Sequence, residues 1–276
     1  MAGNLAFGIH AGNFPGMERL GLRVEQLGYE QLWANDSGGY SGLTTLAACA
    51  PSTRRLQLGV GAIPLLKSPP SEILRQLDET DLPLERLIVG IGSGRKRAGS
   101  LDRVREGVRA LRADRPEVRI ATAAAGPAMC RLGGEIADYV LLTWSLPQRA
   151  AWARDRVAEG AAAANRPMPR VALYVRTALG PGSEARLRRE MARYVTISSD
   201  FERIFAEQGN RLVGIALDST DPQTLAGHLL PYRDIVDTCV VRGMPATDDL
   251  DAWLQIAEAA APHEPMAGSP VRPPGT

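Results

Sequence analysis

The sequence predicts an α/β protein in which eight parallel strands close into a barrel covered by helices. Eight short apolar runs occur along the 276 residues, and stretches with the 3.6-residue periodicity of amphipathic helices separate them. Parallel strands need crossover connections, so this alternation favours a parallel sheet covered by helices. Eight repeats in about 250 residues are typical of a (β/α)8 barrel. A doubly wound open sheet is the alternative, but "FGIHAGNFPG" lacks the Gly-x-Gly-x-x-Gly that follows the first strand of such a sheet.

The predicted strands are six to eight residues long and are separated by polar or helix-like segments. Helices are expected between them, for example over residues 17–27 and 101–111. In chain order, the strands are residues 5–10, 30–35, 56–63, 86–92, 118–124, 139–144, 170–177 and 236–242.

The segment 178–220 departs from the regular alternation. It is expected to hold helices over 181–195, with Ser183 as N-cap, and over 199–208. This pair predicts an enlarged connection between strands 7 and 8. The tail from residue 262 contains five prolines and few apolar residues, so residues 262–276 are predicted to be disordered and residues 1–261 to form one domain.

Composition and charge exclude several classes of protein. The formal net charge is +1, which provides no field for nucleic acid or an anionic membrane. No apolar run approaches the roughly 20 residues that cross a bilayer, and the N-terminus does not resemble a secretion signal. The three cysteines form no disulfide pattern, which is typical of a reduced, cytoplasmic setting.

Familiar catalytic motifs are absent. His10, His228 and His263 have no ligand-like spacing with one another or with cysteine, so no metal site is expected. The segment "GIGSGR" has neither the spacing of a nucleophile elbow nor that of a phosphate P-loop.

Chemistry in a (β/α)8 barrel occurs at the carboxyl ends of the strands. These ends are rich in glycine and alanine and poor in catalytic acids, which favours a flat ligand held by backbone contacts. The residues concerned are His10, 35–37, 61–64, 92–94, 124–127, Thr143, Trp144, Arg176 and Thr177.

Four segments in order resemble the luciferase-like monooxygenase superfamily. They are "VEQLGYEQLWANDS" (24–37), "LAACAPSTRRLQLGVGAIPLLKSPP" (46–70), "ERLIVGIGSG" (85–94) and "RIATAAAGPAMCRLGGEIADYVLLTW" (119–144). In the last segment Gly-Pro precedes a helix and Ala-Asp precedes the next strand, as in that family. The resemblance covers nearly the whole chain and implies a (β/α)8 barrel.

The resemblance also implies a cofactor and its site. Family members use reduced flavin mononucleotide (FMN) with oxygen, or the deazaflavin coenzyme F420 for hydride transfer. The phosphate would meet the backbone at Ala125, Gly126, Pro127 and Ala128, where a helix N-terminus favours an anion. The ring would lie against a strand-3 bulge at Gly61, Ala62 and Ile63, with a cis peptide expected at Gly61–Ala62. Further cofactor contacts are expected at Gly92, Ser93, Gly94 and Trp144.

The chain departs from the deazaflavin branch at two proton-transfer positions. Ser37 stands where histidine is frequent, and Arg95, Lys96 and Arg97 follow where glutamate is frequent. The remaining candidate proton donors are His10, Asp36 and Tyr40. His10 has the reference pKa nearest to neutrality, but it can equally be a hydrogen-bonded strand end, and Asp36 can be a turn residue or helix N-cap.

The resulting hypothesis is an F420H2-dependent oxidoreductase that reduces an activated C=C or C=N bond of a specialised natural product or modified peptide. An FMN-dependent monooxygenase and a non-catalytic flavin-binding protein remain as alternatives. The resemblance further implies a homodimer.

Overall fold

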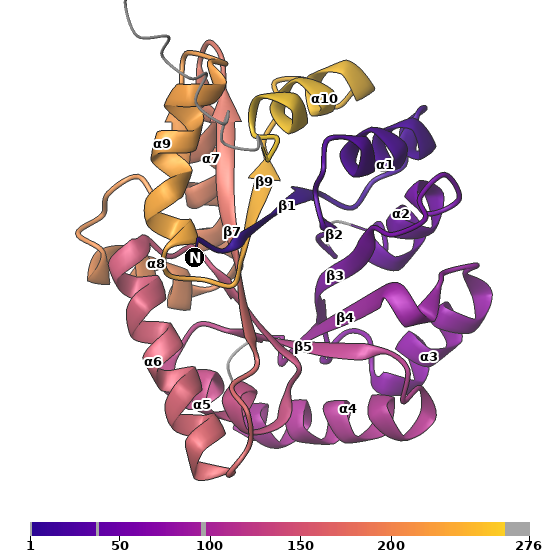
Figure 1. Ribbon diagram of the computed structural model, residues 1–276. Coiled ribbons are helices and arrows are strands. Elements are labelled where there is room, and N and C mark those ends of the chain that lie inside the picture. Colours follow the sequence, from indigo (N-terminus) through magenta and orange to yellow (C-terminus); the bar gives the residue numbers. More distant parts are fainter. Residues whose placement is uncertain (1, 37–38, 95–97, 263–276) are drawn as a thin grey trace, which may run out of the picture.

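The computed structural model describes residues 2–36, 39–94 and 98–262, and eight parallel strands close into a barrel (Figure 1). Each strand pairs with the next along the chain, and β9 pairs with both β7 and β1 to complete the circle. The predicted (β/α)8 barrel is therefore confirmed. The barrel strands are β1 (Asn4–Ile9), β2 (Gln31–Ala34), β3 (Gln57–Pro64), β4 (Leu87–Gly92), β5 (Arg119–Ala124), β6 (Tyr139–Thr143), β7 (Arg170–Leu179) and β9 (Thr238–Gly243).

Helices cover the outside of the barrel (Figure 1). None of the helices in the described part of the chain is long and apolar enough to cross a membrane. The helices of the repeats are α1 (Met17–Gln26), α2 (Gly42–Cys49), α3 (Pro70–Glu79), α4 (Ser100–Asp114), α5 (Pro127–Ile136), α6 (Pro147–Ala163), α9 (Pro222–Arg233) and α10 (Leu250–Ala259).

The enlarged connection between the seventh and eighth barrel strands is present. It contains α7 (Ser183–Ile197) and α8 (Ser199–Glu207), and then an unpredicted short strand, β8 (Ile215–Leu217), which pairs only with the end of β7. The predicted N-cap Ser183 is wrong. Gly182 takes that position with a left-handed φ of 71°, and the Ser183 hydroxyl donates instead to Asp218.

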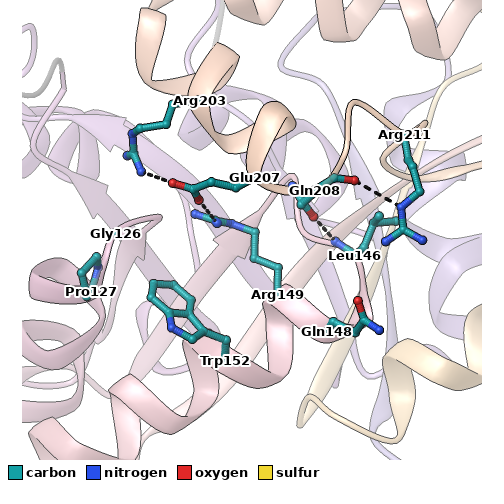
Figure 2. A pocket seen from close by; sticks show the side chains of 10 residues that line it. All are labelled: Gly126, Pro127, Leu146, Gln148, Arg149, Trp152, Arg203, Glu207, Gln208 and Arg211. Carbon is teal, nitrogen blue, oxygen red and sulfur yellow. Dashed lines mark hydrogen bonds and ion pairs between the residues drawn. The ribbon is translucent and has the colours of Figure 1, made fainter.

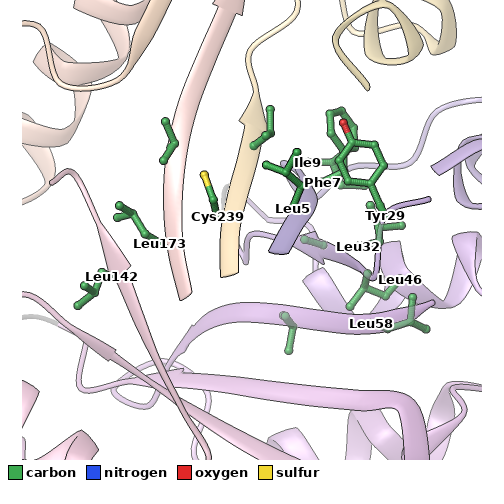
Figure 3. Close-up of a cluster of buried hydrophobic side chains, with 14 of the residues drawn as sticks. Leu5, Phe7, Ile9, Tyr29, Leu32, Leu46, Leu58, Leu142, Leu173 and Cys239 are labelled. Atoms are coloured by element: carbon green, nitrogen blue, oxygen red, sulfur yellow. The ribbon is translucent and has the colours of Figure 1, made fainter. Parts of the chain in front are cut away.

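Alternation along the strands separates two apolar layers. Leu5, Phe7 and Ile9 of β1 face outward and pack in the layer between strands and helices (Figure 3). Ala6 faces inward and joins the cluster inside the barrel, as the period of two for a strand requires. Because both the outward and the inward side chains enter an apolar layer, the buried strands are continuous apolar runs in the sequence.

Large side chains fill the barrel interior because β3 carries glycine at the positions against which they pack. Trp33, Leu141 and Tyr174 belong to the inner cluster. A Cβ on Gly59 would lie 2.3 Å from Cδ2 of Trp33, and one on Gly61 would lie 2.3 Å from Cδ2 of Leu141. Part of the glycine pattern at the strand ends is therefore a packing requirement.

Carboxylates hold the starts of β6 and β9, at the end of the barrel where the strands begin. Asp138, directly before β6, accepts a hydrogen bond of 2.9 Å from the Ile120 amide. Asp237, directly before β9, accepts one of 2.7 Å from the Val171 amide and binds Arg154 through both oxygens. The Ala-Asp step in the sequence thus has a structural role at the base of the barrel.

Candidate functional site

The carboxyl ends of β6 and β7 are covered by α7 and α8, which we call the cap. Trp144, directly after β6, packs with Leu187 of α7 and with Ile204 and Phe205 of α8 in a separate buried cluster. The enlarged connection therefore shields one side of the barrel mouth from solvent.

A pocket of about 580 Å³ lies where α5 begins beside α6 and α8 (Figure 2). We call it the arginine pocket. Its lining residues are Gly126, Pro127, Leu146, Gln148, Arg149, Trp152, Arg203, Glu207, Gln208 and Arg211.

The arginine pocket is positively charged because three arginines face one glutamate. Arg149 and Arg203 both point to Glu207 and bind it (Figure 2). The Nη2 atom of Arg149 also donates to the carbonyl of Ala125 at 2.9 Å. Arg211 donates to the carbonyl of Gln208 at 3.2 Å and has no carboxylate partner in the part of the chain that the structure describes. An anionic group is the ligand that such a pocket favours.

Gly126 opens onto this pocket. It is the N-cap of α5 with extended backbone at φ −107°, a conformation that any residue adopts. A Cβ at Gly126 would meet no atom within 4 Å, so packing does not explain the glycine. Pro127 occupies the first turn of α5 and also lines the pocket. The first amides of a helix lack intrahelical partners and favour an anion.

The other two residues predicted for the phosphate contribute differently. Ala125 presents its carbonyl to Arg149, and Ala128 lies in the first turn of α5 without lining the pocket.

The strand-3 bulge lies at the expected place. The Gly61–Ala62 peptide is cis, and the pairing of β3 with β4 shifts register between Val60 and Ile63. The side-chain Nδ2 of Asn35 donates to the Gly61 carbonyl at 3.3 Å. Ile63 is buried in the layer between strands and helices, so its side chain points away from the barrel interior.

The next predicted cofactor contacts are the last residue of β4 and the two residues that follow it. Gly92 has room for a Cβ at ordinary contact distances, the nearest atom being 3.5 Å away on Ala123. Gly94 has a left-handed φ of 81° and needs glycine for that reason. Ser93 lies between them and accepts a weak hydrogen bond from Arg103 on its carbonyl.

Trp144 is enclosed. Only 1% of the residue is exposed, and its backbone has a φ of 51°. The guanidinium carbon of Arg176 lies 3.6 Å from the ring centre, and Tyr194 and Phe205 meet the ring edge to face. In this arrangement Arg176 lies against one face of the indole.

The predicted proton donors fall into two groups. Asp36 and Tyr40 line a second pocket of about 710 Å³, which also contains Lys67. Burial raises the pKa of Asp36 despite the nearby Lys67, so this carboxyl holds its proton to a higher pH than usual.

His10 is not among the residues that line this pocket. Its Nε2 lies 3.0 Å from Oδ2 of Asp248. Burial and the charge of Arg242 lower the pKa of His10, outweighing the opposing effect of Asp248. The imidazole is therefore held neutral near pH 7, which makes His10 a weaker proton donor than its reference pKa indicates.

Several charged residues of the site were missed from the sequence. Arg149, Arg203 and Arg211 come from α6, α8 and the following loop, and their spacing carries no motif. Arg242 had a readable signal, because it is an arginine near the end of a largely apolar strand, whereas Arg176 was already among the strand-end residues named from the sequence.

Two sequence expectations fall outside the described residues. They concern Ser37 and the basic run Arg95–Lys96–Arg97. In the described ranges no three His, Cys, Asp or Glu side chains are grouped so that they could hold a metal ion.

The family model described as luciferase-like monooxygenase matches residues 4–113 and 98–241. The chain belongs to this family. No curated protein matches the sequence significantly.

Solved structures share the fold at low sequence identity. An F420-dependent secondary alcohol dehydrogenase in complex with an F420-acetone adduct superposes with a TM-score of 0.72 at 12% identity, over 94% of this chain and 98% of that chain. The F420-dependent tetrahydromethanopterin reductase from Methanopyrus kandleri gives 0.70 at 18% identity, over 95% and 98%. The oxygenating constituent of 3,6-diketocamphane monooxygenase from Pseudomonas putida, in complex with FMN, gives 0.65 at 14% identity, over 95% and 98%. The luciferase-like chain thus shares its fold with structures solved with F420 or with FMN bound.

Proposed function

We propose that this luciferase-like protein is an F420H2-dependent reductase that delivers hydride to an activated C=C or C=N bond of a small molecule or peptide. The observation that carries the proposal is the arginine pocket at the N-terminus of α5. Three arginines, one of them without a carboxylate partner among the described residues, outnumber the two carboxylates that pair with them, Glu207 and Asp200. This excess suits the F420 tail, which carries a phosphate and oligoglutamate, better than the single phosphate of FMN.

The residues present fit such a tail. Gly126 leaves open space at the helix N-terminus, and Arg149 is held beside it through the Ala125 carbonyl. Arg203 and Arg211 extend the positive surface away from α5 (Figure 2). We expect the phosphate at Gly126 and Pro127 and the carboxylates of the tail toward Arg203 and Arg211. The neighbours that use F420 support the choice, although their similarity is one of fold alone.

When bound, the reduced deazaflavin supplies a hydride. If the acceptor is a C=C bond, a proton must also be added, either from a side chain of the protein or from water. Asp36 is the described candidate best suited to this role, because burial keeps its carboxyl protonated to a higher pH. His10 is held neutral, and we expect it to orient groups through Asp248 rather than to donate.

Turnover under air and under argon tests the proposal against the monooxygenase alternative. Purified protein is given reduced F420 or reduced FMN with a panel of unsaturated acids and cyclic imines, and products are identified by mass. The proposal predicts reduced products with F420H2 in the absence of oxygen. Oxygenated products that form only with reduced FMN and air would show the monooxygenase instead.

A further inference from the structure

Two buried arginines lie next to each other on the inner face of the barrel near its mouth. Arg176 of β7 and Arg242 of β9 are register partners on neighbouring strands. They follow the inward-facing Tyr174 and Val240 by two residues, so their side chains start from the same face. Only 3% of Arg176 and 8% of Arg242 is exposed. We call these two residues the arginine pair.

The arginine pair donates its hydrogen bonds to neutral acceptors. Arg176 donates to the Thr143 hydroxyl at 2.7 Å and to the Tyr194 hydroxyl at 3.0 Å. Arg242 donates to the Asn35 side-chain oxygen at 2.5 Å and to the Gly243 carbonyl.

Among the described residues neither guanidinium forms an ion pair with a carboxylate. Burial and the charge of Arg176 lower the pKa of Arg242 to about 10, so Arg242 remains charged near pH 7. Buried charges are ordinarily paired, and this pair carries an excess of two positive charges.

The positive charges of both arginines act on one acidic side chain of the cap. Glu190 of α7 is bound to Arg193, with Oε2 2.8 Å from Nε. Although burial opposes it, Arg193 lowers the pKa of Glu190, and Arg176 and Arg242 lower it further. The cap therefore places one carboxylate in the field of the arginine pair without bonding it to them.

A buried hydroxyl beside the pair also lacks a partner. Tyr174 Oη is fully enclosed and finds no hydrogen-bond partner in the described part of the chain. It lies 3.2 Å from the position of a Cβ on Gly61, next to the strand-3 bulge. Burial raises the pKa of this tyrosine, although the charges of Arg242 and Arg176 lower it. Tyr174 lies two residues before Arg176 on β7, on the same inward face.

We infer that the arginine pair is a binding site for a carboxylate of the substrate, close to the strand-3 bulge. The inference rests on the proposed function for the identity of the ligand as substrate. A guanidinium presents a planar fork that matches a carboxylate, and the unpartnered Tyr174 hydroxyl supplies a further donor. Glu190 provides part of the balancing charge when no substrate is bound. The substrate class is accordingly an unsaturated carboxylic acid, or a cyclic imine that bears a carboxylate.

Binding of a carboxylate probe without cofactor tests the inference. Cinnamate, neutral cinnamamide and inorganic phosphate are titrated by calorimetry into the wild-type protein and into Arg242→Gln, Arg242→Lys and Glu190→Gln. Arg105→Gln, which breaks only the exposed pair with Glu135, is the matched control. Circular dichroism establishes that each variant is folded.

We expect cinnamate to bind while cinnamamide and phosphate bind at least about tenfold more weakly. Arg242→Gln should lower the cinnamate affinity about tenfold or more. Arg242→Lys should lower the cinnamate affinity by less, because lysine keeps the charge but lacks the planar fork of the guanidinium. Glu190→Gln should bind cinnamate more tightly, because a competing carboxylate is removed. Arg105→Gln should match the wild type.

Equal affinity for cinnamate and cinnamamide in both the wild type and Glu190→Gln would overturn the inference, as would phosphate binding in place of cinnamate. Titration of F420 into the wild-type protein separates this result from the proposed function. A wild type that binds F420 but not cinnamate rejects the carboxylate site alone, whereas a wild type that does not bind F420 rejects the proposed function.

Discussion

Replacing Gly59 with alanine tests whether glycine in strand β3 serves packing inside the barrel. The added Cβ would lie 2.3 Å, 2.5 Å and 2.6 Å from Cδ2, Cε3 and Cε2 of Trp33, far inside van der Waals contact. Trp33 is fully buried, so its ring cannot turn outward to relieve the overlap. The ring is further held by a 2.8 Å hydrogen bond from Nε1 to Gln31.

The expected cost follows from these contacts. Overpacking of a filled core costs about 1–3 kcal/mol, and loss of the indole hydrogen bond leaves a buried polar group that costs about 1–3 kcal/mol more. Alanine recovers only about 0.4–1 kcal/mol through a less flexible unfolded chain. We expect Gly59→Ala to destabilise the protein by about 2 kcal/mol or more. A domain of this size would then melt about 4–8 °C lower.

Gly92→Ala is the matched control. A Cβ there would meet its nearest atom at 3.5 Å, an ordinary contact, so we expect a change within about 0.5 kcal/mol. Both free energies of unfolding are measured by urea denaturation. Equal stability of the two variants would refute the packing explanation of the inner glycines.

Three further outcomes are expected. Glu25→Gln should destabilise the fold near neutral pH, because the Glu25 carboxylate accepts backbone amides and its pKa lies below 4.5 despite the opposing effect of burial. The deficit should vanish as pH falls through that lowered pKa, as followed by urea unfolding across pH. His10 should titrate below 6.5 in NMR spectra, and Asp248→Asn should lower its pKa further; a higher pKa in the variant would contradict the pairing. The lowered pKa of His10 means that stability is lost as pH falls from 6.5 through the folded value, because the unfolded state binds that proton first. Gly126→Val should weaken cofactor binding about tenfold, ~1.4 kcal/mol, without loss of stability, whereas Gly227→Val, at an equally open glycine in α9, should change neither; equal cofactor affinity in the two variants would remove Gly126 from the site.

The strands and the barrel could be predicted because their residues are buried on both faces. The run Leu5–Ile9, for example, is apolar whichever way each side chain points, and most residues of the other barrel strands are apolar too. Strand β8 carried no such signal, since its three residues pair only with the end of β7. The cap was predicted as two helices, but nothing in their sequences indicated that Leu187 and Phe205 pack on Trp144.

The candidate site could be predicted only in part. Gly126 and Pro127 line a pocket, as the strand-to-helix turn indicated. The arginines that give the pocket its charge come from separate elements, so no local spacing reveals them. The glycines at 59 and 61 were ambiguous, because a small residue next to a ligand and a small residue next to a tryptophan look the same in sequence.

Direct titration of the two cofactors tests the central claim, that the arginine pocket holds the tail of F420. Oxidised F420 and FMN are each titrated into the wild-type protein and into Arg211→Glu, which reverses the charge of the arginine that has no carboxylate partner among the described residues. We predict that F420 binds the wild type more tightly than FMN does, and that Arg211→Glu weakens F420 binding about tenfold or more while affecting FMN less. Tight binding of FMN with no binding of F420 would contradict the account.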